Sequence, residues 1–285
     1  MAMDDRVGAV VGELAPLVRS LGRGRYGIAL GGAHAKGVDD AESDIDIYLF
    51  ADEALPNDER ARLCREFSPH IDAVVAWGDT ANFEQAGSDF HYRSRKVECW
   101  LRGIRYVSDI IAECRAGIVR HSLVTWTVMG YYNYCTLSDL DKLVVVDDRH
   151  GVLANWKAAV RPYPPELRRA IVARFMQAAL FWPDNFHYKS AVERADLIYV
   201  MGIVQQVAHN LIQVVFALNE TYFPGDKKLG AALAHLQVKP PEFEGRIARL
   251  LYPGAAPDTQ SLRRQRAEPV ALAAEVKALT EYTHE

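Results

Sequence analysis

Two aspartates separated by one residue stand at the start of an apolar run. Asp44 and Asp46 lead into residues 47–50, Ile-Tyr-Leu-Phe. On a β-strand, residues i and i+2 point to the same face and lie about 6.6 Å apart. Two carboxylates held side by side repel each other unless a cation lies between them. Because Mg²⁺ binds through a few protein carboxylates together with water and phosphate oxygens, the spacing predicts a magnesium site here.

A glycine-rich turn precedes the aspartates and completes a pattern. Gly32 and Gly37 enclose four residues, and Ser43 stands directly before Asp44 and Asp46. This order resembles the signature of the DNA polymerase beta-like nucleotidyltransferase superfamily, which reads Gly-Ser-x-x-x-Gly, a short loop, and then Ser-Asp-x-Asp at the start of a strand. The resemblance covers the segment from Tyr26 to the hairpin around Glu98 closely and the rest of the chain loosely. It implies a catalytic domain that transfers a nucleotide.

In enzymes of this superfamily the turn holds the phosphates of the nucleotide. The resemblance implies that Gly32, Ala33, His34, Gly37 and Ser43 contact ATP. Glycine lets the backbone approach a phosphate closely, and backbone N–H groups can bind it. Ala33 departs from the pattern, because the family usually has a serine there whose hydroxyl helps to hold the phosphates. For His34, a polar residue exposed in a loop is the alternative interpretation.

A third carboxylate is expected on a neighbouring strand. Residues 90–93 and 97–101 flank the sequence Ser-Arg-Lys, which predicts a β-hairpin. Within residues 97–101 the only charged side chain is Glu98, and a lone carboxylate in an apolar strand is costly unless it binds something. By the resemblance, Glu98 would complete the metal site with the two aspartates. Asp72, in another apolar run, is the rival for this role, and an outward-facing glutamate on an edge hairpin is the other interpretation of Glu98.

The remaining patterns predict an α+β chain. Short apolar runs first alternate with helical periodicities, and strands then give way to helices. We expect an N-terminal nucleotidyltransferase fold, a mixed sheet flanked by helices, in residues 1–112 and a C-terminal all-α helical bundle in residues 113–285. Helices are predicted over residues 120–133 and over residues 187–219, the latter as one rod kinked near Gly202.

A loop in the helical half supplies a second phosphate-binding candidate. Residues 218–229, Leu-Asn-Glu-Thr-Tyr-Phe-Pro-Gly-Asp-Lys-Lys-Leu, resemble a motif from the helical domain of small bacterial nucleotidyltransferases, including antibiotic-modifying ones. In such enzymes a lysine of the second domain often reaches the nucleotide phosphates, so the resemblance implies this role for Lys227 or Lys228. A surface loop that ends a helix is the alternative.

The resemblance implies a magnesium-dependent transfer of AMP from ATP to a hydroxyl group. Asp44, Asp46 and Glu98 would bind two Mg²⁺ ions about 3.5–4 Å apart, one on the triphosphate and one on the acceptor hydroxyl. Glu98 would also be suited to take the proton of the acceptor. The length and the two-domain layout resemble aminoglycoside and lincosamide nucleotidyltransferases, which modify antibiotics. Glu193 and Asp196 in the helical half would suit a cationic aminoglycoside.

Two other functions remain open. A protein side chain is the acceptor in minimal nucleotidyltransferase antitoxins that adenylylate a partner toxin, although those are usually much shorter, single-domain chains. Alternatively, the chain is a nucleotide-binding regulatory protein that has lost catalysis, with Ala33 as the first sign. Retention of three carboxylates argues against this, because an unused acidic cluster destabilises a fold.

Composition limits the partners and the compartment. The 285 residues carry a net charge of −4, so the chain has no overall positive field for a long nucleic acid. Four scattered cysteines without a metal-binding spacing favour reduced thiols, and residues 1–11 show no signal peptide, so we expect a cytoplasmic enzyme. The apolar stretch 197–218 contains several polar side chains, which favours a buried helix over a membrane span. The acceptor, the preference for ATP and the oligomeric state do not follow from the sequence.

Overall fold

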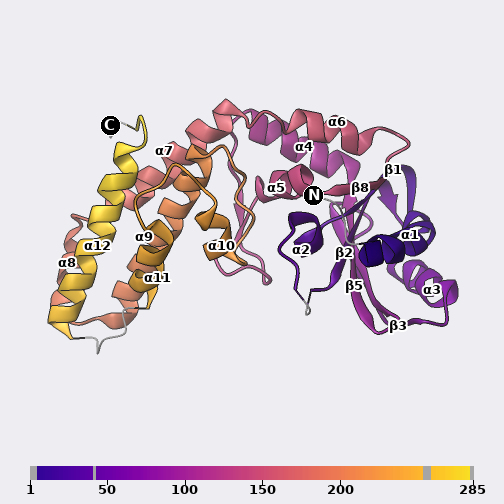
Figure 1. The fold of residues 1–285 in the computed structure, drawn as a ribbon, viewed down its shortest axis with the longest axis horizontal. Helices are drawn as coiled ribbons and strands as arrows, with labels where there is room; N and C mark the ends of the chain where they lie inside the picture. The colour runs from indigo at the N-terminus through magenta and orange to yellow at the C-terminus, as the bar shows by residue number, and fades with distance from the viewer. Residues whose placement is uncertain (1–4, 41–42, 253–257, 283–285) are drawn as a thin grey trace. The chain divides into compact units, whose positions relative to one another are not determined.

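The structure is a computed structural model that describes residues 5–40, 43–252 and 258–282. Its architecture is α+β, a mixed sheet flanked by helices followed by a set of C-terminal helices, which confirms the predicted class (Figure 1). The chain divides into two compact units. Each unit has its own secondary structure and is described separately below.

The boundary between the units differs from the one expected after residue 112. The first unit comprises residues 1–113 and 136–162, and the second comprises residues 114–135 and 163–285. The chain therefore returns to the first unit after a short excursion. The reason is strand pairing, because Val144 and Val145 pair with Leu30 and Ala29 at the edge of the sheet.

A six-stranded mixed sheet forms the centre of the first unit, in the order β3-β4-β5-β2-β1-β8. β2 and β5 run parallel, and all other neighbours run antiparallel. The strands are β1 (Gly22–Leu30), β2 (Ile45–Ala54), β3 (Ile71–Gly78), β4 (Gln85–Tyr92), β5 (Arg95–Gly103) and β8 (Val144–Asp147). The helices of this unit are α1 (Asp5–Ser20), α2 (Gly32–Lys36), α3 (Asn57–Phe67), α4 (Ile104–Arg115), α5 (Cys135–Lys142) and α6 (Val152–Ala159).

The two faces of β2 differ in character, because one is apolar and the other carries both apolar and charged side chains. Its residues Ile45, Ile47 and Leu49 lie in one buried cluster with residues of α1 and α3. Alternation sends Asp46 and Phe50 to the opposite face. At one end of that face the Phe50 ring contacts Trp156 of α6, with ring centroids 5.2 Å apart. At the other end, around Asp46, the face carries charged residues.

Lys157 joins two helices of the returning segment, α6 and α5. Its ammonium group donates to the carbonyl oxygens of Leu140, Asp141 and Leu143 at 3.1, 3.2 and 2.8 Å. These carbonyls lie at or just beyond the end of α5, where a helix leaves its last acceptors without partners. A cation is favourable at the C-terminal end of a helix, so Lys157 stabilises α5.

The second unit combines helices with a short two-stranded ribbon, so the predicted helix over residues 120–133 is wrong. β6 (His121–Ser122) pairs with β7 (Tyr131–Tyr132) instead. The Asp226 carboxylate accepts the backbone N–H groups of Val128 and Met129 at 2.7 and 2.9 Å and holds the connection in a non-helical conformation. The helices are α7 (Pro165–Phe181), α8 (Phe186–Glu193), α9 (Leu197–Leu218), α10 (Leu229–Ala234), α11 (Phe243–Leu251) and α12 (Thr259–Ala278).

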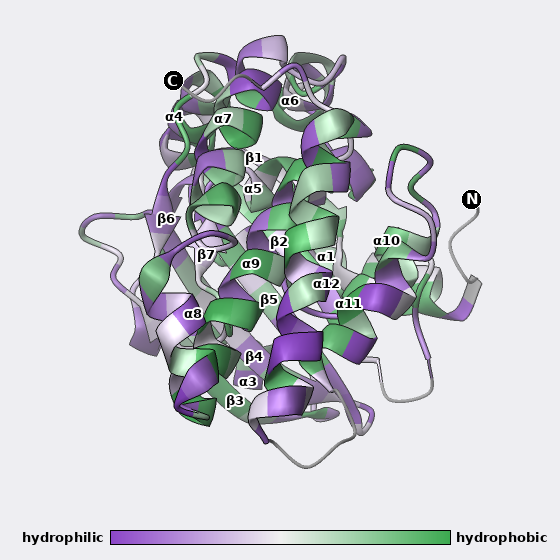
Figure 2. Ribbon diagram, turned by 90° about the vertical axis from the view of Figure 1, so that its left-hand side faces the viewer, coloured by the Kyte–Doolittle hydropathy of each residue, from purple (hydrophilic) through white to green (hydrophobic). Residues whose placement is uncertain are grey.

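The predicted rod over residues 187–219 is two helices, α8 and α9. The break lies at residues 194–196 rather than at Gly202, because Ala195 adopts a positive φ of 54° and Asp196 caps α9 by accepting the N–H of Tyr199. In Figure 2, hydrophobic segments run along α9. Length and composition would allow α9 to cross a membrane, but 78% of its apolar window is buried within the structure. It is the core helix of the second unit.

Candidate active site

Three carboxylates lie in one row across three adjacent strands. Asp46 on β2 is the register partner of Glu98 on β5, and Glu98 is in turn the partner of Asp89 on β4. Register partners point to the same face of a sheet. Asp44 precedes Asp46 by two residues and points to that face as well. The parallel pairing of β2 with β5 therefore brings Glu98 beside the predicted aspartate pair.

Asp46 experiences strong repulsion from its neighbours. Burial, followed by the charges of Asp44, Glu98 and Asp139, raises the pKa of Asp46 to about 7, and Lys36 acts in the opposite direction. A carboxyl group in such surroundings resists ionisation unless positive charge is added. A divalent cation is one source of that charge.

The turn between β1 and β2 lies directly against Asp46. Gly32 has a φ of 58°, and a Cβ atom added to it would lie 1.6 Å from Oδ2 of Asp46. Gly31 donates its N–H to the Asp46 carbonyl at 2.8 Å. Gly37 closes α2 in the left-handed conformation, with a φ of 66°. A glycine at position 32 is thus required for the backbone to approach the carboxylate this closely.

The acidic row and this close approach fit a Mg²⁺ ion that has few protein ligands. Mg²⁺ keeps several waters and takes phosphate oxygens in addition to one or two carboxylates. The described residues contain no group of three or more histidine, cysteine or carboxylate side chains that could hold a metal by themselves. Asp44, Asp46 and Glu98 would therefore hold the ion together with a nucleotide rather than as a closed cage.

The other residues expected at the phosphates have varied surroundings. Ala33 lies in the first turn of α2, and its carbonyl accepts the N–H groups of Gly37 and Val38. The His34 side chain is largely buried, with Nδ1 3.4 Å from Asp39, and its Nε2 is buried without a partner among the described residues. It is therefore not the exposed loop residue of the alternative interpretation. The Ser43 hydroxyl is engaged locally, since it donates to the Asp40 carboxylate at 3.0 Å.

A cation already contacts two of the three predicted carboxylates. Lys96 Nζ donates to Asp44 Oδ2 at 3.1 Å and also to Glu98 Oε1. Its hydrogen bond to Glu98 raises the pKa of Lys96 above its ordinary value. Burial raises the pKa of Asp44, but the hydrogen bond and charge of Lys96 outweigh burial and hold that pKa below its usual range. The sequence offered a signal for this contact, because Lys96 and Glu98 are two residues apart on one strand.

Asp139 joins the site from a segment that the sequence analysis did not single out. It accepts Lys36 Nζ at 3.2 Å and Arg102 Nη1 at 3.4 Å. Arg102 is 5% exposed, and its guanidinium carbon lies 5.0 Å from the centre of the Tyr48 ring. Asp139 thereby holds Lys36 beside the glycine turn. Lys36 could have been found from its place next to Gly37, whereas Asp139 lies 103 residues further along the chain.

Asp72, the rival for the third carboxylate, lies away from the acidic row. It is on β3, the edge strand beyond β4, and is paired with His91, whose Nδ1 lies 3.2 Å from Asp72 Oδ1. β4 and β5 separate β3 from β2. The fold therefore places Glu98, and not Asp72, next to Asp46.

Lys227 and Lys228 lie in the second unit, between α9 and α10. Lys228 has a φ of 55° and directly precedes α10. Asp226, beside them, anchors the connection between β6 and β7 through the two backbone N–H groups described above. A role of these lysines at the nucleotide stays a prediction.

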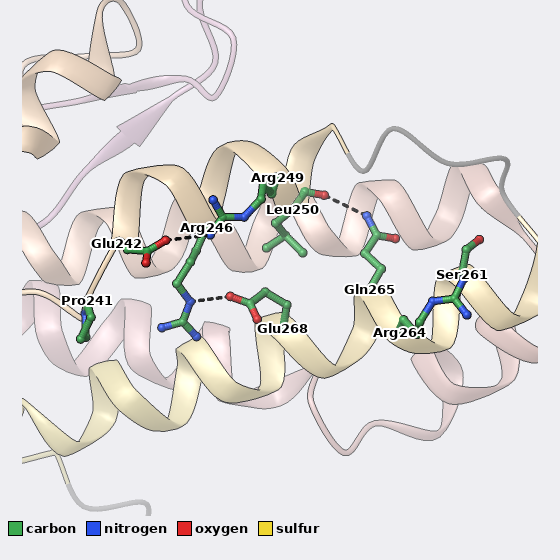
Figure 3. A pocket seen from close by; sticks show the side chains of 9 residues that line it. All are labelled: Pro241, Glu242, Arg246, Arg249, Leu250, Ser261, Arg264, Gln265 and Glu268. Carbon is green, nitrogen blue, oxygen red and sulfur yellow. Dashed lines mark hydrogen bonds and ion pairs between the residues drawn. The ribbon is translucent and has the colours of Figure 1, made fainter.

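A pocket of about 630 Å³ in the second unit has a different character (Figure 3). It lies between α11 and α12, and two of its arginines are paired with acidic residues. Arg246 donates to Glu268 at 2.5 Å, and Arg249 contacts Glu242 at 3.3 Å. Gln265 donates to the carbonyl of Leu250 at 2.8 Å. None of the predicted catalytic residues lines this pocket.

Comparisons with known proteins do not identify the function of this chain. Residues 133–229 match a family model described as a domain of unknown function, DUF4037, and this is less than half of the chain. No curated protein matches the chain. A solved structure described as a nucleotidyltransferase-like protein from Exiguobacterium sibiricum 255-15 is similar to it, with a TM-score of 0.48 and 9% sequence identity over 94% of this chain and 74% of that chain. A likeness of this size identifies neither a family nor a function.

Proposed function

We propose that the protein is a magnesium-dependent nucleotidyltransferase that transfers AMP from ATP to a hydroxyl group of a small molecule. The observation that carries the proposal is the junction of three features at one point of the sheet. The Asp44–Asp46 pair, Glu98 on the parallel neighbour, and the glycine turn that contacts Asp46 all meet there.

Each of these groups has a role in the proposed reaction. Asp44, Asp46 and Glu98 would hold Mg²⁺, which when bound neutralises the triphosphate and polarises the attacking hydroxyl. The backbone from Gly32 to Gly37 would bind the phosphates. Glu98, beside the aspartate pair, is suited to accept the proton of the acceptor hydroxyl.

The acceptor is proposed from the layout of the chain, since a helical unit accompanies the sheet unit. A hydroxylated antibiotic is the acceptor class suggested by the sequence resemblance. The acidic pair expected to attract a cationic aminoglycoside has other partners, because Glu193 pairs with Arg263 and Asp196 caps α9. The structure thus supplies no feature that favours an aminoglycoside over an uncharged acceptor.

A nucleotide-binding protein without catalysis is the second candidate, and two observations favour it. Ala33 replaces the serine of the family pattern, and Lys96 contacts two of the predicted metal ligands. Adenylylation of a protein side chain has no structural feature of its own in its favour.

Calorimetric titration with a non-hydrolysable ATP analogue tests the proposal. The wild-type protein is expected to bind the analogue only with Mg²⁺, and Asp46→Asn to bind it at least tenfold more weakly. Asp72→Asn, a matched change on the edge strand, is expected to bind as the wild type does. Mass spectrometry of hydroxylated antibiotics after incubation with ATP then detects AMP transfer.

Two results would count against the proposal. If the analogue bound without Mg²⁺, and with the same affinity in Asp46→Asn as in the wild type, nucleotide binding would not involve the proposed metal site. Magnesium-dependent binding without any AMP transfer would favour the non-catalytic candidate.

A further inference from the structure

We propose that Lys96 is an internal competitor of the divalent metal, because its ammonium group occupies the oxygens of Asp44 and Glu98 that the metal would use. The inference rests on the proposed function, since it concerns the same carboxylates. It concerns Lys96, which lies beside the predicted metal ligands, and gives it a defined effect, which is to weaken metal binding.

The strand geometry makes the contact a built-in feature. Asp46 pairs with Glu98 in the parallel register, so Asp44 and Lys96, each two residues earlier, extend the two strands side by side. The ammonium group thus meets one carboxylate on its own strand and one beside the neighbouring strand. A solvated lysine at a hairpin tip would not contact carboxylates from two separate strands.

The exposure of the three side chains allows exchange. Lys96 is 53% exposed, whereas Asp44 and Glu98 are 34% and 26% exposed. Lysine carries a compact charge on a flexible stem, and it lies near the turn of the hairpin. The ammonium group can therefore leave the carboxylates for solvent without moving the strands that position them.

The charges explain why the lysine and the metal exclude each other. A carboxylate oxygen has two lone pairs, but Mg²⁺ on one and the ammonium group on the other would place two positive charges next to each other, where they repel. Opposite charges within about 4–6 Å favour the ionised carboxylate, and like charges at this distance repel. The lysine therefore balances the acidic row when no metal is bound and must move when the metal enters.

The test measures metal affinity rather than activity. Mn²⁺ is titrated into the full-length protein without nucleotide at an ionic strength of about 0.15 M, where charges that are not in contact are largely screened. Free Mn²⁺ is followed by electron paramagnetic resonance. Lys96→Met is expected to bind Mn²⁺ about five- to tenfold more tightly than the wild type, the size of effect expected for one partly exposed ion-pair network. Lys96→Gln is a second variant that keeps a polar side chain, and circular dichroism establishes that both are folded.

Arg95→Met is the matched control. Arg95 is an exposed neighbour on the same strand, and its replacement removes the same unit of charge from the hairpin while Lys96 stays in contact with the carboxylates. It is expected to change the Kd for Mn²⁺ by less than twofold, because exposed charges that are not in contact are largely screened.

The outcomes separate the inference from the proposed function. If the wild type binds Mn²⁺ and both Lys96→Met and Lys96→Gln bind it equally well or more weakly, the inference is overturned. The proposed metal site is then unaffected. Equal tightening in Lys96→Met and Arg95→Met overturns it too, because the effect would then come from net charge. Absence of Mn²⁺ binding in the wild type and in every variant overturns the inference, whereas the proposed function is decided by the titration with Mg²⁺ and the ATP analogue.

Discussion

The two units differ in how their clusters of polar side chains are stabilised. In the second unit the Tyr132 hydroxyl lies 3.0 Å from His209 Nε2, and the Tyr134 hydroxyl donates to Gln213 at 2.7 Å. Donors and acceptors match there, and the groups stabilise one another. In the first unit, Asp46 is surrounded by carboxylates that repel it. A satisfied polar cluster is a structural feature, whereas a cluster of like charges gains stability when a ligand binds.

The largest expected effect comes from Gly32→Ala, which would disrupt the contact between the glycine turn and Asp46 in the first unit. The new methyl group would overlap Asp46 Oδ2, and the φ of 58° is strained for alanine. We expect AMP transfer to fall by about a thousandfold, roughly 4 kcal/mol of activation free energy, because the turn and the carboxylate can no longer touch. Steady-state kinetics measure the change.

Gly12→Ala in α1 is the control for that variant. An added Cβ at position 12 meets no atom within 4 Å. Alanine is a better helix former than glycine, so this variant should be as stable as the wild type or more stable by up to about 1 kcal/mol. Equal activity of Gly32→Ala and Gly12→Ala would show that the turn has no role in the reaction.

The second effect concerns the polar cluster of the second unit and its dependence on pH. Burial lowers the pKa of His209 to about 4, whereas an unfolded histidine has a pKa of about 6.5. The unfolded state therefore binds more protons between these values. The stability that His209 contributes is fully present above pH 6.5 and is lost as the pH falls to 4, by up to roughly 3 kcal/mol.

Urea unfolding at a series of pH values measures this loss. A His209→Gln variant should show a smaller decrease between pH 6.5 and pH 4 than the wild type. Replacement of the exposed His187 by glutamine serves as the comparison and should leave the decrease unchanged. A decrease of the same size in all three proteins would mean that His209 is not its source.

The smallest expected effects are changes in stability of opposite sign in the two clusters. Asp46→Asn removes one of several repelling charges from the acidic row, so thermal unfolding in EDTA should show a gain of about 1 kcal/mol. Tyr134→Phe in the second unit should instead lose about 1 kcal/mol, because it leaves the Gln213 carbonyl without its donor. Destabilisation by both changes would remove the distinction between the two clusters.

The sequence allowed most of the sheet unit to be predicted, since its signals are local. The apolar run after Asp46 predicted β2, and the two runs that flank Ser-Arg-Lys predicted the β4–β5 hairpin. The lone charge in its strand pointed to Glu98. Asp139 could not be predicted, because the chain passes through the second unit before α5 returns to the sheet.

In the helical half, one long-range contact and one helix cap decided the outcome. The carboxylate of Asp226 holds the connection at residues 128–129, which local propensity would make helical. The capping of α9 by Asp196 placed the break before that helix, although Gly202 was the more obvious breaker. Asp226 lies 98 residues from Val128, so periodicity could not reveal that contact, whereas Asp196 is a local cap three residues before Tyr199.

The return of residues 136–162 to the first unit also bears on how the protein can be divided. A fragment ending at residue 112 would lack β8, so the outer side of β1 at Leu30 would become an open edge. Open edges pair with other chains and promote aggregation. A fragment intended to fold as the first unit alone would therefore need residues 136–162 joined to residues 1–113.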